Sequence, residues 1–313
     1  MNNLKKIGLT ALAGALTSVS VNAADLSVTG SASINLAQGD GVDTGNGFTM
    51  GDTITFTASQ DYDEGMTVTF TQALDRGIND GGSLQVDMGD KGVFTFHGID
   101  GSSVLGSKDD TTPNVGEEAW DDVNGATPAI GGAASDDMFH YSHSSLIDGL
   151  TLAVAYVPSD LATGQAQEES SIDYGAEYTT EGGLTVGVAM GENNAVEAGG
   201  LENTIVYGNM TVAESFQIGF TNSTSNSEVA NADVDFQAYG ISFAASEELS
   251  VSINTSSHDY ENVALQDQDA IGVSVAYVMG SMTFKANHNS VDNIAGARAD
   301  DRSGYNLNLA FAF

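Results

Sequence analysis

The stretch GYNLNLAFAF, residues 304–313, ends the chain and decides how it folds. One phase of its two-residue repeat is apolar and holds Tyr305, Leu307, Leu309, Phe311 and Phe313. The other phase begins with Asn306 and Asn308. Successive side chains of a β-strand point to opposite faces, so the pattern predicts a strand with one apolar and one polar face. Chain ends are usually polar and loosely held. This one alternates between apolar and polar residues instead, so we expect it to be committed to a sheet.

The first twenty-three residues have the three parts of a secretory signal peptide. Lys5 and Lys6 form a positive start, residues 7–16 form a short apolar run, and Val21-Asn22-Ala23 is a cleavage site of small residues. We expect residues 1–23 to be removed on export and residues 24–313 to form the folded protein. The apolar run is too short to favour the alternative, a membrane anchor helix.

The chain is strongly acidic and lacks cysteine. Forty-three Asp and Glu residues face eight Lys and Arg residues, and two of those eight precede the expected cleavage site. Such a surface repels phosphates, which argues against a nucleic-acid partner. The absence of cysteine excludes disulfides and thiolate metal sites.

Period-two alternation recurs along the rest of the chain and predicts strands. We expect sixteen of them, at residues 25–37, 50–60, 65–75, 83–89, 91–99, 138–145, 149–158, 170–181, 183–191, 201–212, 215–224, 233–246, 248–259, 269–279, 281–290 and 302–313. Tight turns alternate with long polar connections between these segments. In an up-and-down sheet this order places every tight turn on the rim that carries both termini. The polar phases are rich in Thr, Ser, Asn, Gln and Gly, which suit a wet lumen better than the dry core of a sandwich. The expected fold is an all-β, 16-stranded antiparallel transmembrane barrel, whose closure leaves no unpaired strand edge in lipid.

Four features together resemble the general porins of Gram-negative bacteria: the signal peptide, the sixteen segments, the long acidic connection after the fifth segment, and the terminal AFAF. The stretch KGVFTFHGID, residues 91–100, is also similar to the strand before the constriction loop of alphaproteobacterial porins. The resemblance implies an outer-membrane homotrimer that lets small hydrophilic solutes diffuse passively. It implies that the barrel-assembly machinery reads Phe313, Phe311 and Tyr305. It also implies that residues 100–137, here called the acidic loop, fold into the pore and constrict it.

The acidic loop contains three pairs of neighbouring acids. They are Asp109 with Asp110, Glu117 with Glu118, and Asp121 with Asp122. Rings of acids select cations, so we expect these six residues to narrow the pore and make it prefer cations. The alternative is a solvated external loop whose acids have no specific role.

Strand phase places Lys285, His140, Asp87 and Asn287 on the lumen wall. Porins usually set wall arginines across from the acidic loop, whereas this chain keeps only six basic residues after cleavage. We expect no cofactor, and at most weak calcium binding by Asp109, Asp110, Asp121 and Asp122, because their spacing matches no defined calcium loop.

Two other classes of function remain open. The run HYSHSS, residues 140–145, holds serine and histidine as a hydrolase does. However, neighbours in a strand alternate faces, and wall residues explain the run better. A structural or adhesive barrel would have its lumen plugged by loops and would not conduct.

Overall fold

The structure is a computed structural model that describes residues 25–40, 46–62, 65–108, 110–129, 136–158, 170–193, 200–213 and 215–313. The expected signal peptide and Asp109 lie outside the described residues. The described chain forms sixteen strands: β1 (Asp25–Gly39), β2 (Phe48–Tyr62), β3 (Met66–Asp75), β4 (Ile78–Asp87), β5 (Val93–Ile99), β6 (Met138–His143), β7 (Leu150–Val157), β8 (Ser171–Thr179), β9 (Leu184–Asn193), β10 (Leu201–Val212), β11 (Phe216–Ser227), β12 (Val234–Ala244), β13 (Leu249–Tyr260), β14 (Gln268–Met279), β15 (Met282–Asp292) and β16 (Arg302–Ala312). Two single turns of 3-10 helix, η2 (Gly89–Lys91) and η3 (Ile294–Gly296), complete the described elements.

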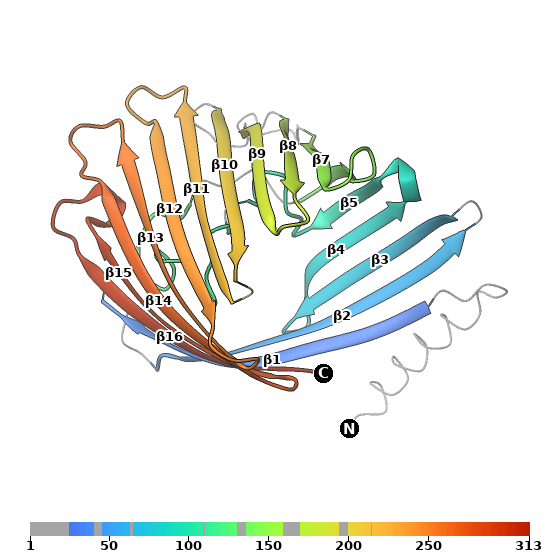
Figure 1. Cartoon of the computed structure of the whole chain (residues 1–313), viewed down its shortest axis with the longest axis horizontal. Helices are drawn as coiled ribbons and strands as arrows, with labels where there is room; N and C mark the ends of the chain where they lie inside the picture. The colour runs from blue at the N-terminus through green and yellow to red at the C-terminus, as the bar shows by residue number, and fades with distance from the viewer. Residues whose placement is uncertain are drawn as a thin grey trace.

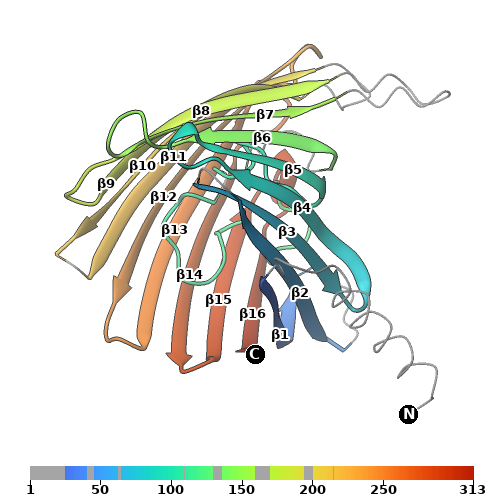
Figure 2. The ribbon, with the colours of Figure 1, turned by 90° about the vertical axis from the view of Figure 1, so that its right-hand side faces the viewer.

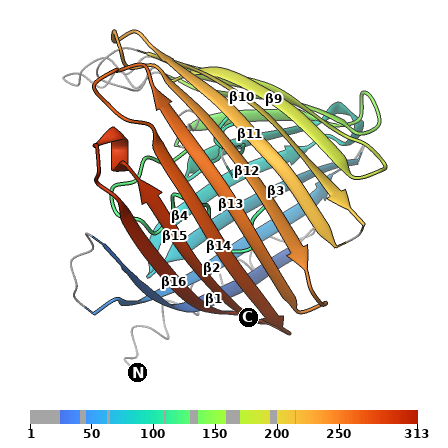
Figure 3. The ribbon, with the colours of Figure 1, turned by 60° about the vertical axis from the view of Figure 1, so that its left-hand side comes forward.

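Each strand pairs antiparallel with its neighbour in the chain, and β16 pairs with β1 to close a barrel. Figure 1 shows the C-terminus beside β1. There the N–H of Phe313 donates to the carbonyl oxygen of Gly30 at 2.8 Å, and the N–H of Gly30 donates back at 3.2 Å. The strands run obliquely to the barrel axis (Figure 3), as closure requires. The predicted fold, an antiparallel barrel of sixteen strands, is confirmed.

The two phases of the strands separate as expected. On β12, the outward Tyr239 and Ile241 are 55% and 48% exposed, while the inward Phe236 and Ala238 are fully buried. Large exposed apolar side chains on the outward phase recur around the barrel. Such a continuous apolar exterior suits hydrocarbon, and the closed sheet satisfies the backbone hydrogen bonds that lipid cannot. Among the described residues, no helix is both long and apolar enough to span a membrane.

The prediction that every tight turn lies on the rim of the termini is wrong at one position. Strands β3 and β4 are joined at the opposite rim by Arg76 and Gly77 alone. Both have positive φ, 49° and 77°, which is the backbone of a type I′ hairpin turn. A side-chain N–H of Arg76 donates to the carbonyl oxygen of Met50 at 2.7 Å. Alternation does not reveal this hairpin, because β4 begins at Ile78 instead of the predicted residue 83 and a register shift beside Gly82 interrupts the repeat.

Candidate functional site

The acidic loop lies along the inside of the barrel, as its hydrogen bonds show. Its described residues form hydrogen bonds with inward-facing side chains on β8, β11, β13, β14, β15 and β16, and Lys108 lies over the ring of Tyr207 on β10. Figure 2 shows this green segment passing within the wall. The loop therefore covers the inner side of β8–β16, and the inner faces of β1–β5 lie on the other side of the lumen.

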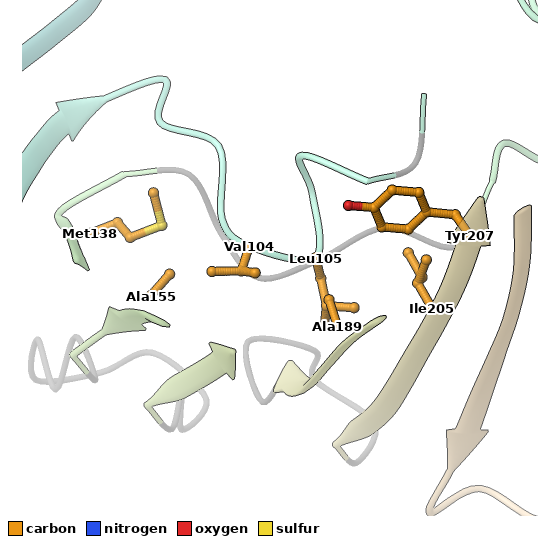
Figure 4. Close-up of a cluster of buried hydrophobic side chains, with 7 residues drawn as sticks. All are labelled: Val104, Leu105, Met138, Ala155, Ala189, Ile205 and Tyr207. Carbon is orange, nitrogen blue, oxygen red and sulfur yellow. The ribbon is translucent and has the colours of Figure 1, made fainter. Parts of the chain in front are cut away.

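The start of the loop is held by a buried carboxylate on β8. Asp173 is fully buried, and its two oxygens accept the backbone N–H groups of Val104 at 3.0 Å and Leu105 at 3.2 Å. The side chains of Val104 and Leu105 enter an apolar cluster (Figure 4). Its other members are Met138, Ala155, Ala189, Ile205 and Tyr207. The start of the loop is thus held by charge-assisted hydrogen bonds and by apolar packing.

The loop's own base is paired with an acid of the wall. Lys108 Nζ lies 3.0 Å from Glu177 Oε2 on β8 and 5.4 Å from the centre of the Tyr207 ring. The hydroxyl of Tyr207 donates to the same Glu177 oxygen. Tyr207 therefore faces the lumen and is only 1% exposed, so its ring packs inside the barrel and not against lipid.

Neutral amides on β15 and β16 hold the middle of the loop. Asn287 and Asn306 donate to the two carboxylate oxygens of Asp122 at 2.9 and 3.0 Å. Asn289 donates to the backbone carbonyls of Glu118 and Asp121 at 2.6 and 2.7 Å. These donors bind the loop without bringing positive charge to it.

The end of the described loop is held by side chains of β13 and β14. Gln268 accepts the N–H of Thr127 at 2.8 Å and donates to its carbonyl oxygen at 3.0 Å. His258 Nε2 lies 2.8 Å from the carbonyl oxygen of Pro128. Earlier in the loop, Trp120 packs edge-on against Phe236 of β12, with 5.2 Å between the ring centres.

Glycines on the inner wall give the loop its room. A Cβ on Gly240 would lie 2.4 Å from the carbonyl oxygen of Pro113, and one on Gly304 would lie 2.1 Å from that of Asp122. Side chains at these places would force the loop away from the wall. Where the loop backbone comes closest to a strand, the inward-facing residue of that strand must therefore be glycine.

The acids of the loop are unevenly exposed. Glu117, Glu118 and Asp121 bring carboxylate oxygens within 4.8 Å of one another. Burial raises the pKa of Glu118 to about 8, and the charge of Asp110 and the hydrogen bond with Asp121 act in the same direction. Burial also raises the pKa of Asp110 and of Asp121. The cluster of Glu117, Glu118 and Asp121 is partly desolvated and therefore carries less than its full formal charge near neutral pH.

Lys285 lies where strand phase predicts it, on the inner face of β15. Its Nζ donates to the carbonyl oxygen of Gly116 at 3.4 Å. Burial raises the pKa of Glu117, and the positive charge of Lys285 opposes this rise. This base consequently stands on the same side of the lumen as the acids, not across from them.

Within the described strands β1–β5, which face the loop, no lysine or arginine occupies an inward position, although His97 of β5 does. Asn35 on β1 pairs with the inward-facing Asn308, which fixes the inward phase of β1 and, by register, of β2–β5. This phase holds mostly hydroxyl side chains, among them Ser31, Thr53, Thr55, Thr57, Thr69, Thr71, Ser83 and Thr95. The transverse field that wall arginines would create across the loop has no source here.

The structure places the other predicted wall residues as follows. Asn287 holds Asp122, as described above. His140 pairs with Thr95 and Ala155 and so shares the inward phase next to the start of the loop. Asp87 is also inward by register, but it lies at the end of β4 and accepts the N–H of Gly89 at 2.8 Å. Asp87 thus stabilises the turn that leads into η2.

Sequence reasoning missed the side chains that hold the loop, notably Asp173, Glu177 and Gln268. A usable signal existed: Asp173 and Glu177 are acids on the inward phase of a predicted strand, where most neighbours are small and neutral. Their partners lie 68 or 69 residues away in the chain, and alternation says nothing about such distant contacts.

A family model for Gram-negative porins matches residues 8–313. This chain belongs to the Gram-negative porin family. No curated protein sequence matches the porin at a significant level. Its fold is similar to that of OmpF from Salmonella typhi, solved with daunomycin, with a TM-score of 0.70 at 14% identity over 92% of this chain and 97% of that one. An anion-selective porin from Comamonas acidovorans gives a TM-score of 0.69 at 13% identity over 93% and 100% of the two chains.

Membership of this family settles the broad function. The porin is an outer-membrane channel for passive diffusion, as the resemblance implied. It is not an enzyme, and the serine and histidine residues of HYSHSS belong to the wall and rim of a channel.

Proposed function

We propose that this porin prefers cations and that the acidic loop sets the preference. One observation supports this most directly: neutral amides bind Asp122 and the loop carbonyls beside it, and the inward positions of the facing strands β1–β5 hold no lysine or arginine. Fixed negative charge in a narrow, low-dielectric passage raises the local concentration of cations and lowers that of anions. The Comamonas porin shows the same fold and is described as anion-selective, so the sign of selectivity has to come from each chain's own side chains.

The preference is expected to depend on salt. At ~0.15 M ionic strength the Debye length is about 8 Å, and at 1 M it is about 3 Å. Charges lining a passage of molecular width therefore act across it in dilute salt and only near the wall in concentrated salt. The cation preference should weaken steadily as KCl is raised.

The experiment compares two variants that each replace six acids by the corresponding amides. In the first, Asp109, Asp110, Glu117, Glu118, Asp121 and Asp122 become Asn or Gln. In the second, the same is done to six exposed acids on the outward phase, near the rim opposite the termini: Glu192, Glu202, Asp235, Asp259, Asp269 and Asp292. In a gradient of dilute KCl, the first variant should move the reversal potential toward the anion side and the second should not. Equal shifts would mean that the total charge, not the acidic loop, sets the preference.

We propose that the channel works without a cofactor and binds calcium weakly. Calcium takes six to eight oxygen ligands, whereas the cluster of Glu117, Glu118 and Asp121 offers three carboxylates and Glu118 is largely protonated near neutral pH. Of the four acids predicted for calcium, Asp109 is outside the described residues and Asp122 is held by two asparagines. Micromolar calcium should leave the reversal potential unchanged, and a change at that concentration would reveal a tight site.

We also propose that the porin assembles as a homotrimer and is inserted by the barrel-assembly machinery. Membership of the porin family supports both proposals, whereas the contacts of this single chain do not bear on them. Cross-linking of the protein in outer-membrane vesicles, followed by denaturing electrophoresis, should give a ladder that ends at three copies.

A further inference from the structure

We propose that Asp173 is the positioning residue for the acidic loop: it fixes where the loop starts, without meeting the solutes that pass. This inference rests on the proposed role of the loop in selectivity. Asp173 is fully buried, so no permeating ion reaches its carboxylate. Both of its oxygens are instead used by consecutive backbone N–H groups of the loop, those of Val104 and Leu105.

The N–H groups that donate to Asp173 lie at the start of a helical turn of the loop. The N–H of Ser107 donates to the carbonyl oxygen of Ser103 at 2.9 Å, and that of Lys108 donates to Leu105 at 2.9 Å. Residues 103–108 therefore form a compact helical turn, and its first N–H groups are the ones that Asp173 accepts. Unpaired N–H groups at the start of such a turn need an acceptor, and a carboxylate is the strongest that a side chain offers.

Beyond this turn the loop is also fixed at the wall. Thr112 lies against Thr221 of β11 with 3.0 Å between the two hydroxyl oxygens, and both residues are buried. The stretch between Leu105 and Thr112 contains Lys108 and Asp110, and Asp110 is close enough to raise the pKa of Glu118. Release of the turn at Asp173 should therefore displace the first acids of the loop as well.

Two variants remove the contact in different ways. Asp173→Asn keeps the shape, but it replaces one acceptor oxygen by an NH2 donor and removes the charge. Val104→Pro removes one N–H donor and keeps every charge, and proline is tolerated at the first position of a helical turn. Asp61→Asn is the matched control, because Asp61 is an inward acid of β2 that is hydrogen-bonded to Thr67 and not to the loop. Insertion of each variant is checked by heat-modifiable migration.

The chain has no cysteine, so an introduced pair reports the loop position alone. Thr112→Cys with Thr221→Cys replaces two oxygens that already lie 3.0 Å apart and should form a disulfide under mild oxidation. In the presence of Asp173→Asn or Val104→Pro, disulfide formation should slow about tenfold, the factor expected for losing a hydrogen bond to a charged group. Asp61→Asn should leave the rate unchanged. This readout does not depend on the sign of selectivity, so a failure of the proposed function would not be mistaken for a failure of this inference.

The functional readout is the reversal potential in a gradient of dilute KCl. Asp173→Asn should shift it further toward the anion side than Asp61→Asn does, and Val104→Pro should shift it although no charge has changed. Strong oxidation of the cysteine pair should restore the potential in the Val104→Pro variant. If Val104→Pro left both the disulfide rate and the potential at wild-type values, or if Asp173→Asn behaved like Asp61→Asn in both, Asp173 would not position the loop.

Discussion

Asn287 on β15 donates a hydrogen bond of 2.9 Å to Oδ2 of Asp122, a residue that precedes it by 165 positions in the chain. Asn306 on β16 donates to the other oxygen of the same carboxylate at 3.0 Å. A bidentate arginine could have bound Asp122 as well, but it would have cancelled the charge. Two neutral amides hold Asp122 and leave the negative charge of its carboxylate uncancelled.

Replacing Asn287 and Asn306 together by alanine should loosen the middle of the loop. Hydrogen bonds to a charged group contribute about 1.5–3 kcal/mol each, although the solvated lumen reduces this figure. Asp122 keeps its charge, so the channel should still prefer cations while its single-channel current becomes noisier. Asn308→Ala is the control, since Asn308 bonds to Asn35 and not to the loop. Equal noise in the double variant and the control would mean that the two amides do not hold the loop.

Cation preference should increase between pH 6.5 and pH 9.5. Glu118 has a pKa of about 8 because it is buried and lies near Asp110 and Asp121, so it gains its negative charge within this range. The free energy of unfolding changes in the opposite direction. The folded chain binds this proton more tightly than an unfolded chain, in which the pKa of Glu118 has its ordinary value of 4.5. The stability that the proton contributes is therefore lost as the pH rises through 8. Reversal potentials of the wild type and of Glu118→Gln across the range provide the measurement. A pH response that survives in Glu118→Gln would assign the titration to another group.

Gly240→Ala should reduce single-channel conductance. The added Cβ would lie 2.4 Å from the carbonyl oxygen of Pro113 and 2.8 Å from Cγ2 of Thr112, so the loop must move toward the passage. Overpacking of this kind typically costs about 1–3 kcal/mol. The matched control is Gly82→Ala, whose Cβ would meet nothing within 4 Å. Unchanged conductance in Gly240→Ala, with normal insertion, would show that the loop does not limit the current.

Deleting Phe313 should reduce the amount of barrel inserted in the membrane. The Phe313→Ala variant distinguishes the role of the aromatic ring from that of the backbone hydrogen bonds. The deletion removes both closing hydrogen bonds with Gly30, while the alanine variant keeps the backbone and loses only the ring. Phe313 is 80% exposed, so its side chain adds little to packing within one chain. If the assembly machinery reads the aromatic ring, pulse-chase measurements of heat-modifiable protein will show both variants to be slow. Normal insertion of Phe313→Ala would restrict the role of this residue to its backbone.

The sequence was most informative where the chain meets lipid. Leu307, Leu309 and their counterparts alternate because one face must be apolar, and this requirement is local, so fifteen of the strands are predicted to within a few residues. The predicted start of β4 was wrong because residues 78–82 include two glycines and a register shift. The acids of the loop were also visible as pairs. The side chains that hold these acids were not visible. Asp173, Gln268 and Asn289 contact loop residues that are 68 to 171 positions away in the sequence, and such pairings depend on closure of the whole barrel.

Whether this porin conducts and prefers cations is measured by the reversal potential of the wild-type protein in a planar bilayer under a gradient of KCl. We expect stepwise conductance, a potential on the cation side in dilute salt, and a decline of that potential toward zero as salt approaches 1 M, where the Debye length falls to about 3 Å. A potential on the anion side in dilute salt, or a cation preference that does not change with salt, would contradict this expectation.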